Sequence, residues 1–155
     1  MCLQYAIWAL GSLGHAKYDE YADVFYKRAR QYLDADEMKG DGEHFITLAH
    51  AQACALTATY EARTMLFTRA AMSVARTVRL TQMMGLDRLD DPNVNLPPAL
   101  GPTTSWAELE ERRRTLWGAF AIDCHASIST GWPNLLLSSN VSLSLLFAYL
   151  LVTPC

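Results

Sequence analysis

The sequence has few charged residues of either sign: 13 Lys and Arg and 16 Asp and Glu give a net charge of −3. It has no long basic block, and its densest basic run is the triple arginine Arg112–Arg114. Proteins that bind nucleic acid draw much of their affinity from basic side chains that neutralise phosphates. A mildly acidic chain with one short basic run is therefore not expected to bind DNA by itself.

Cysteine is also scarce and scattered. The four cysteines, Cys2, Cys54, Cys124 and Cys155, form no Cys-x-x-Cys pair. Structural zinc sites and the disulfide frameworks of small secreted domains usually show closely spaced cysteines. We therefore expect reduced thiols, and we predict that this chain binds neither a metal nor another cofactor.

Catalytic motifs are missing as well. The sequence contains no glycine-rich phosphate loop, no Gly-x-Ser-x-Gly and no His-Glu-x-x-His. Cys124 and His125 are adjacent, so on a helix their side chains diverge and cannot act as nucleophile and base together. We predict no catalytic residues and no enzyme activity, with a site assembled from distant residues as the weaker alternative.

Helical periodicity is what the sequence does contain. Apolar residues recur at steps of three and four over the segments 18–33, 45–63, 66–84 and 105–128. The apolar segment 2–13 has no basic residue before it, which favours a buried helix over a signal peptide. No alternating strand pattern of useful length occurs. The sequence therefore predicts an all-α, compact domain of about five helices.

The chain changes character after Pro133, because every charged residue lies before that point. We expect the apolar tail 134–155 to pack poorly and to expose apolar surface, with a further helix in it as one alternative. Its apolar run is shorter than the ~20 residues that span a bilayer, so a membrane span is not expected.

The triple arginine is predicted to be paired within its own helix. Adjacent helical residues point about 100° apart, so the three side chains cannot form one basic surface. Glu108 and Glu110 stand four residues before Arg112 and Arg114, the favourable spacing for ion pairs. Arg113 falls instead on the predicted apolar face, which also carries Leu109, Leu116, Trp117, Phe120, Cys124 and Ile128.

Asp123 lies partly on the same apolar face, and its helical neighbours include no cation. A buried carboxylate needs a partner, because burying it unpaired is costly. We predict a structural ion pair between Asp123 and Arg79 of the preceding helix, with Arg76 as the second choice, rather than a catalytic role.

Two segments together resemble a known family. "RRRTLWGAFAIDCHASISTGWP" (112–133) is similar to the signature of the fungal-specific transcription factor domain, the middle homology region of fungal zinc-cluster regulators. "RLTQMMGLDR" (79–88) resembles a helix end of that family, with Asp87 in place of the usual histidine. We call the matching positions the signature residues, namely Arg79, Gly85, Arg113, Trp117, Phe120, Asp123, Gly131 and Pro133.

The resemblance implies that residues 1–133 are part of a regulatory domain of a fungal transcription factor, located in the nucleus. In that family DNA and zinc are bound by a separate zinc-cluster module, which this sequence does not contain. A protein or a small-molecule effector is the partner expected for the domain itself. After Pro133 the family continues with acidic residues and a Leu-Pro, and the tail has neither. The alternative is a helical module that binds a ligand or a protein outside transcription.

Overall fold

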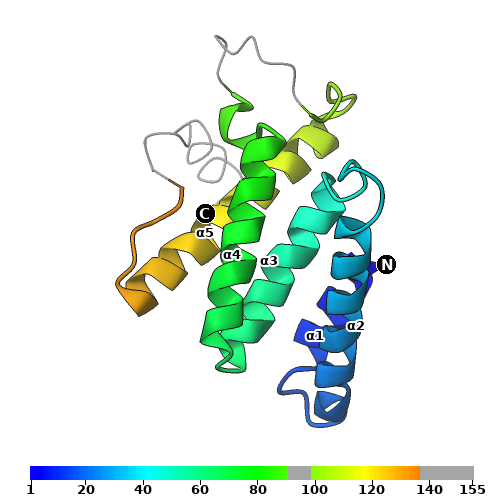
Figure 1. Ribbon diagram of the computed structural model, residues 1–155, viewed down its shortest axis with the longest axis vertical. Helices are drawn as coiled ribbons and strands as arrows, with labels where there is room; N and C mark the ends of the chain where they lie inside the picture. The colour runs from blue at the N-terminus through cyan, green and yellow to red at the C-terminus, as the bar shows by residue number, and fades with distance from the viewer. Residues whose placement is uncertain (91–98, 137–155) are drawn as a thin grey trace, which may run out of the picture.

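The computed structural model describes residues 1–90 and 99–136, which form five α-helices and one short 3-10 helix and contain no β-strand (Figure 1). The all-α fold and the number of helices predicted from periodicity are confirmed. The helices are α1 (Cys2–Ser12), α2 (Asp19–Glu37), α3 (Leu48–Arg63), α4 (Phe67–Met83), η1 (Leu86–Arg88) and α5 (Trp106–Thr130).

Helix α3 lies in the middle of the domain and contacts α1, α2, α4 and α5. Helix α1 packs against both α2 and α3, and α4 packs against α3 and α5. In Figure 1, α2, α3 and α4 stand side by side, and α5 crosses behind α4 at an angle. The central position of α3 means that its small residues set how closely the other helices approach.

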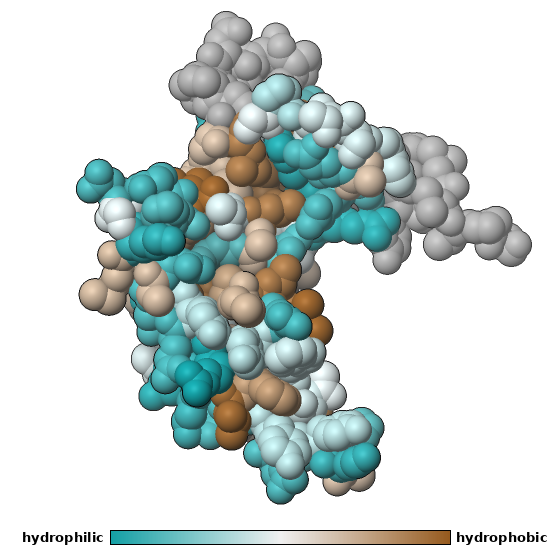
Figure 2. All heavy atoms as spheres, turned by 90° about the vertical axis from the view of Figure 1, so that its right-hand side faces the viewer, coloured by the Kyte–Doolittle hydropathy of each residue, from teal (hydrophilic) through white to brown (hydrophobic). Residues whose placement is uncertain are grey.

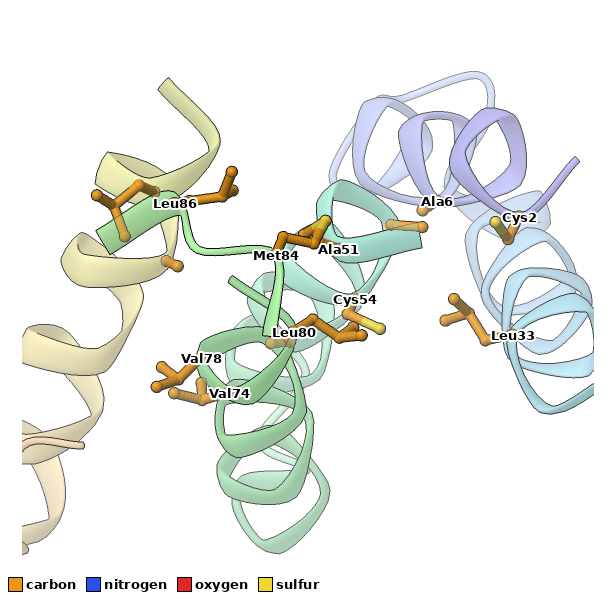
Figure 3. Close-up of a cluster of buried hydrophobic side chains, with 14 of the residues drawn as sticks. Cys2, Ala6, Leu33, Ala51, Cys54, Val74, Val78, Leu80, Met84 and Leu86 are labelled. Carbon is orange, nitrogen blue, oxygen red and sulfur yellow. The ribbon is translucent and has the colours of Figure 1, made fainter. Parts of the chain in front are cut away.

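The core combines small residues on α3 with larger side chains from the surrounding helices. Ala51 and Ala53 are completely buried on α3, where the absence of a long side chain allows close helix packing. Leu33, Met84 and Leu116 enter the same core from α2, from the end of α4 and from α5. Figure 3 shows Leu33, Ala51 and Met84 among the side chains between the helices.

Two helix ends follow directly from local sequence. Helix α5 begins after Ser105, whose hydroxyl accepts a hydrogen bond from the Glu108 backbone N–H at 3.2 Å, as the capping pattern predicts. The Glu108 carboxylate reaches one residue further back than expected, to the Thr104 N–H at 2.9 Å. Helix α4 ends at Met83, the left-handed Gly85 with a φ of 70° follows its cap residue Met84, and Leu86 then folds back into the core.

The buried face of α5 differs from the predicted one. Ile128 was placed on the apolar face but is 86% exposed, and Trp117 and Phe120 lie half-buried at the edge of the core. The helix contacts α3 and α4 through a face rotated by about one residue, which buries Arg112, Thr115, Leu116, Ala119 and Asp123. A single-helix pattern of apolar residues does not determine this rotation, because it depends on the neighbouring helices.

The beginning of the apolar tail packs into the domain. Leu136 is 1% exposed and belongs to the hydrophobic core, so the expectation that the tail packs poorly is wrong at this residue. The remaining part, 137–155, with its alternative further helix, lies outside the described residues. None of the helices in the described part of the chain has the length and apolar character needed to cross a membrane.

Candidate functional site

Asp123 is buried, and its partner is the backbone rather than an arginine. One oxygen of its carboxylate, Oδ2, accepts hydrogen bonds from the N–H groups of Leu135 and Leu136, both at 2.8 Å. Two backbone donors satisfy a buried carboxylate without a cation, since hydrogen bonds to an ionised acceptor are strong. The Asp123 carboxylate thus ties the segment after α5 to the middle of that helix.

The predicted ion pair between Asp123 and Arg79 is therefore wrong. Arg79 is exposed on α4. The second choice, Arg76, pairs with carboxylates of α2 instead, at 3.2 Å to Glu37 and 3.8 Å to Asp34. Periodicity places both arginines just off the buried face of α4, but it does not show which neighbouring helix that side faces.

Gly131 and Pro133 make the turn that brings the chain back to Asp123. Gly131 has a φ of 75°, a left-handed conformation that glycine adopts without steric cost, and its N–H donates to the Ser127 carbonyl at 2.8 Å. Pro133 cannot continue a helix and favours an extended Trp132 before it. Together these signature residues end α5 and direct Leu136 into the core.

Arg113 joins α5 to the segment that follows η1. Its Nη2 lies 2.5 Å from Oδ1 of Asp90, and its Nε donates to Oδ2 of the same carboxylate at 3.3 Å. This two-pronged hydrogen bond to Asp90 raises the pKa of Arg113. The signature arginine therefore has a structural role between two distant parts of the chain.

The other two arginines of the run pair as predicted. Arg112 lies 2.7 Å from Glu108, and Arg114 lies 2.9 Å from Glu110, each one turn earlier on α5. Because all three arginines of the run face carboxylates, the run does not present an unpaired basic surface for phosphate groups.

The signature residues do not converge on one cavity. Trp117 and Phe120 contact each other edge to face, with ring centroids 5.6 Å apart, at the margin of the core. Arg79 lies on the exposed side of α4, and Gly85 forms the turn after it. The described geometry gives these residues roles in packing, in turns and in joining segments.

A surface cleft of about 600 Å³ lies between α1, α3 and α5, and neither Gly131 nor Pro133 lines it. Trp106 and Ile7, which line it, are 71% and 52% exposed. Figure 2 shows the molecule hollowed on one side, with hydrophobic side chains bordering the hollow. Seven of the twelve lining residues are apolar or glycine, namely Leu3, Ile7, Ala55, Leu56, Trp106, Ala107 and Gly118, and five are polar or charged, namely Gln52, Glu110, Glu111, Arg114 and Thr115.

A few polar groups stand among these apolar residues. The Gln52 side-chain amide on α3 donates to the Glu111 carboxylate and to the Thr115 hydroxyl on α5, both at 3.1 Å. Arg114 and Glu110 form their ion pair at the same wall. Apolar walls with a few placed polar groups are typical of sites for small organic ligands.

Sequence reasoning missed this cleft because its lining residues come from three helices that are far apart in the chain. Each helix contributes only a few of them, so no local motif appears.

Apart from the cleft, a group of three side chains has the right atoms to bind a metal ion. Cys2, Asp36 and His50 each place one potential ligand atom within 4.8 Å of the other two. The prediction of no bound metal rested on the spacing of cysteines along the sequence. Spacing does not show that α1, α2 and α3 bring these three residues together.

Comparison with known proteins gives one family and several relatives from fungi. The family model described as the fungal specific transcription factor domain matches residues 1–148. The chain is 38% identical over 136 residues to the pigment biosynthesis transcriptional activator pigB of Monascus ruber, a match that covers 86% of this chain and 24% of that protein. It is 36% identical over 132 residues to the citrinin biosynthesis transcriptional activator ctnR of Monascus purpureus, covering 85% of this chain and 22% of the relative.

A further relative is the ascochitine biosynthesis cluster transcriptional regulator of Didymella fabae, which is 31% identical over 133 residues, covering 86% of this chain and 22% of that protein. The chain thus spans about a quarter of the length of the curated relatives it matches. No solved structure matches it significantly. The family match covers almost the whole chain, and the relatives are named as regulators of transcription. The resemblance read from the two sequence segments is confirmed: the chain belongs to the family of the fungal specific transcription factor domain.

Proposed function

We propose that this chain is a regulatory domain of an activator that controls a fungal biosynthetic gene cluster. The proposal is supported by the names of the relatives, which include regulators of pigment, citrinin and ascochitine biosynthesis. In this role the domain works in the nucleus, carries out no catalysis and changes the activity of a transcription factor.

The domain influences transcription without contacting DNA itself. Its net charge is −3, and Arg112, Arg113 and Arg114 are each paired with a carboxylate. Positive charge that is already neutralised by neighbouring carboxylates contributes little to phosphate binding. Contact with DNA belongs in this proposal to the zinc-cluster module of the family.

In this proposal a regulatory ligand binds in the cleft between α1, α3 and α5. The size of the cleft is the observation that supports this part of the proposal. Its volume of about 600 Å³ fits the range of roughly 300–1,000 Å³ that is common for small-molecule sites. The ligand is largely apolar and has a polar group that reaches Gln52 or Arg114. A second candidate is an amphipathic helix of a partner protein, favoured by the exposed Trp106 and Ile7 that line the cleft.

Dye binding tests the cleft as a ligand site. Nile red is an uncharged apolar dye, so it suits a cleft whose charged residues are Glu110, Glu111 and Arg114. Gly118 lines the cleft and a Cβ there would meet nothing within 4 Å, so Gly118→Leu is chosen to fill part of the cleft. We expect saturable dye fluorescence that Gly118→Leu weakens about tenfold or more, equivalent to a loss of about 1.4 kcal/mol.

The matched control is Ala121→Leu, an exposed position on the same helix that does not line the cleft. It should leave dye binding unchanged, and near-ultraviolet circular dichroism should show that both variants keep the native fold. Equal binding by the wild type and both variants would remove the cleft from the proposal.

A reporter assay tests the regulatory role. We expect the chain, fused to an unrelated DNA-binding module, to change transcription of a matching reporter relative to that module alone. In a gel-shift assay the unfused chain should not retard duplex DNA at physiological salt. An unchanged reporter would contradict the regulatory role, and sequence-specific retardation by the unfused chain would contradict the proposal that it does not contact DNA.

A further inference from the structure

His50 is the most unusual buried polar side chain among the described residues. It lies in the first turn of α3, is 1% exposed, and has two buried ring nitrogens without a hydrogen-bond partner. Buried polar groups are nearly always paired, because desolvating them without a partner destabilises the fold. An imidazole with both nitrogens unpaired therefore indicates that something else completes this site.

The groups around the ring are two carboxylates and a thiol. His50 Nδ1 lies 3.8 Å from Oδ2 of Asp36, and Nε2 lies 3.7 Å from Oε1 of Glu37, both too long for a hydrogen bond. Cys2 comes from the first turn of α1, and Figure 3 shows it at the α1 side of the core cluster. The site therefore draws on the start of α1, the end of α2 and the start of α3.

We propose that Cys2, Asp36 and His50 bind a divalent transition-metal ion of the zinc class through the thiolate, one carboxylate oxygen and Nδ1. Zinc–ligand distances of about 2.0–2.3 Å place neighbouring ligand atoms of a tetrahedron about 3.3–3.8 Å apart. The Nδ1–Oδ2 distance of 3.8 Å is about 0.3 Å longer than a nitrogen and an oxygen bound to the same zinc ion require. The three ligand atoms lie within 4.8 Å of one another, so contraction by about 1 Å completes the arrangement.

The ligand types select the class of ion. A thiolate with an imidazole favours zinc, cobalt or copper, whereas magnesium and calcium prefer sites made of oxygen atoms. Glu37 faces the other ring nitrogen, where a carboxylate commonly accepts the second N–H of a metal-bound histidine and fixes the ring. Arg76 holds Glu37 in place at 3.2 Å. Asp36, at 42% side-chain exposure, leaves a route from solvent.

Burial affects two of the ligands in opposite ways. Desolvation lowers the pKa of His50, which keeps the imidazole neutral, and neutral imidazole is the form that binds metals. Desolvation raises the pKa of the Cys2 thiol and so opposes its ionisation, and the metal must displace this proton to solvent when it binds. The bound cation then compensates the charge of the thiolate and of the neighbouring carboxylates.

Cobalt is a suitable probe, because a thiolate bound to cobalt gives a charge-transfer band in the near ultraviolet. We expect the full chain, stripped with a chelator, to bind one cobalt ion, to show this band, and to lose it when zinc is added. Cys2→Ser should abolish the band, His50→Gln should abolish tight binding, and Asp36→Asn should weaken binding at least about tenfold.

Two other thiols give matched controls. Cys54 is buried on α3, and Cys124 is half-buried on α5, but neither belongs to the ligand group. Cys54→Ala and Cys124→Ser should keep the band and the stoichiometry. If His50→Gln fails to fold, the more exposed Asp36→Asn carries the same test. The absence of saturable cobalt binding, or an unchanged band in Cys2→Ser, would overturn the proposal.

Discussion

The carboxylate of Asp123 accepts the backbone N–H of Leu136 at 2.8 Å, across thirteen residues of sequence. The same oxygen accepts the N–H of Leu135, and the Leu136 side chain is buried in the core. Hydrogen bonding and apolar burial thus hold the same short segment. The Asp123 carboxylate has the structural task of fixing the chain after α5.

Replacing Asp123 by alanine should destabilise the domain by about 3 kcal/mol, because two backbone donors lose a charged acceptor and are left in a largely buried site. Asp123→Asn should cost less, since its amide oxygen still accepts a hydrogen bond. Urea unfolding followed by circular dichroism measures both free energies of unfolding.

The partner of Asp123 is tested by two further variants. Arg79→Ala should change the free energy of unfolding by less than about 0.5 kcal/mol, because Arg79 is exposed. Leu136→Ala should cost about 2–5 kcal/mol, and combining it with Asp123→Ala should cost less than the sum. Strong coupling between Asp123 and Arg79, with none to Leu136, would contradict this account.

Adjacent arginines should differ in their contribution to stability. Arg113→Ala breaks a two-pronged, largely buried pair with Asp90 and should cost about 2 kcal/mol. Arg114→Ala removes an arginine that is 69% exposed beside Glu110 and should cost less than about 0.5 kcal/mol. Equal free energies of unfolding for the two variants would show that the Asp90 pair is not formed in solution.

Two glycines on α5 should respond to alanine in opposite directions. Gly118 lies inside the helix with open space beside it, so Gly118→Ala should stabilise the domain by about 0.5–1 kcal/mol. Gly131 has a φ of 75°, so Gly131→Ala should destabilise it by about 1 kcal/mol. Thermal unfolding gives the sign directly, and a stabilised Gly131→Ala variant would exclude the turn described at the end of α5.

The acid sensitivity of the fold should depend on Glu108. The Thr104 backbone N–H, followed by Arg112, lowers the pKa of Glu108 below its ordinary value of 4.5. A carboxyl group with a lowered folded pKa stabilises the protein above pH 4.5, and this contribution is lost as the pH falls through the folded pKa. The melting temperature of Glu108→Gln should therefore fall less steeply below about pH 4.5 than that of the wild type. Identical pH profiles would contradict this role.

Features that depend on neighbouring residues along the chain could be predicted from the sequence. The cap of α5 at Ser105, the left-handed stop at Gly85 and the ion pair between Glu108 and Arg112 each involve residues within four positions of one another. The presence of the helices could also be predicted, because apolar residues recur along the chain at steps of three and four. Helix α3 shows the limit of this reasoning. The apolar pattern predicts a helix from residue 45, whereas α3 begins at Leu48, after Thr47, whose hydroxyl accepts the His50 N–H and caps the helix.

Features that depend on how helices meet could not be predicted. The donors to Asp123 come from a returning backbone segment, and a backbone N–H has no signature in the sequence. The cleft joins three helices, and the cluster around His50 joins the first turn of α1 to the end of α2 and the start of α3. Each depends on packing angles that residue type and spacing along one helix do not determine.

The most direct test of the proposed regulatory role is reporter output from the fused chain when the cleft alone is filled. If a ligand or partner acts through the cleft, Gly118→Leu should shift reporter transcription severalfold, whereas Ala121→Leu on the same helix should match the wild type. Near-ultraviolet circular dichroism and equal protein levels ensure that both variants are compared as folded proteins. If both folded variants give wild-type reporter output, the cleft is not the regulatory site and the central proposal is contradicted.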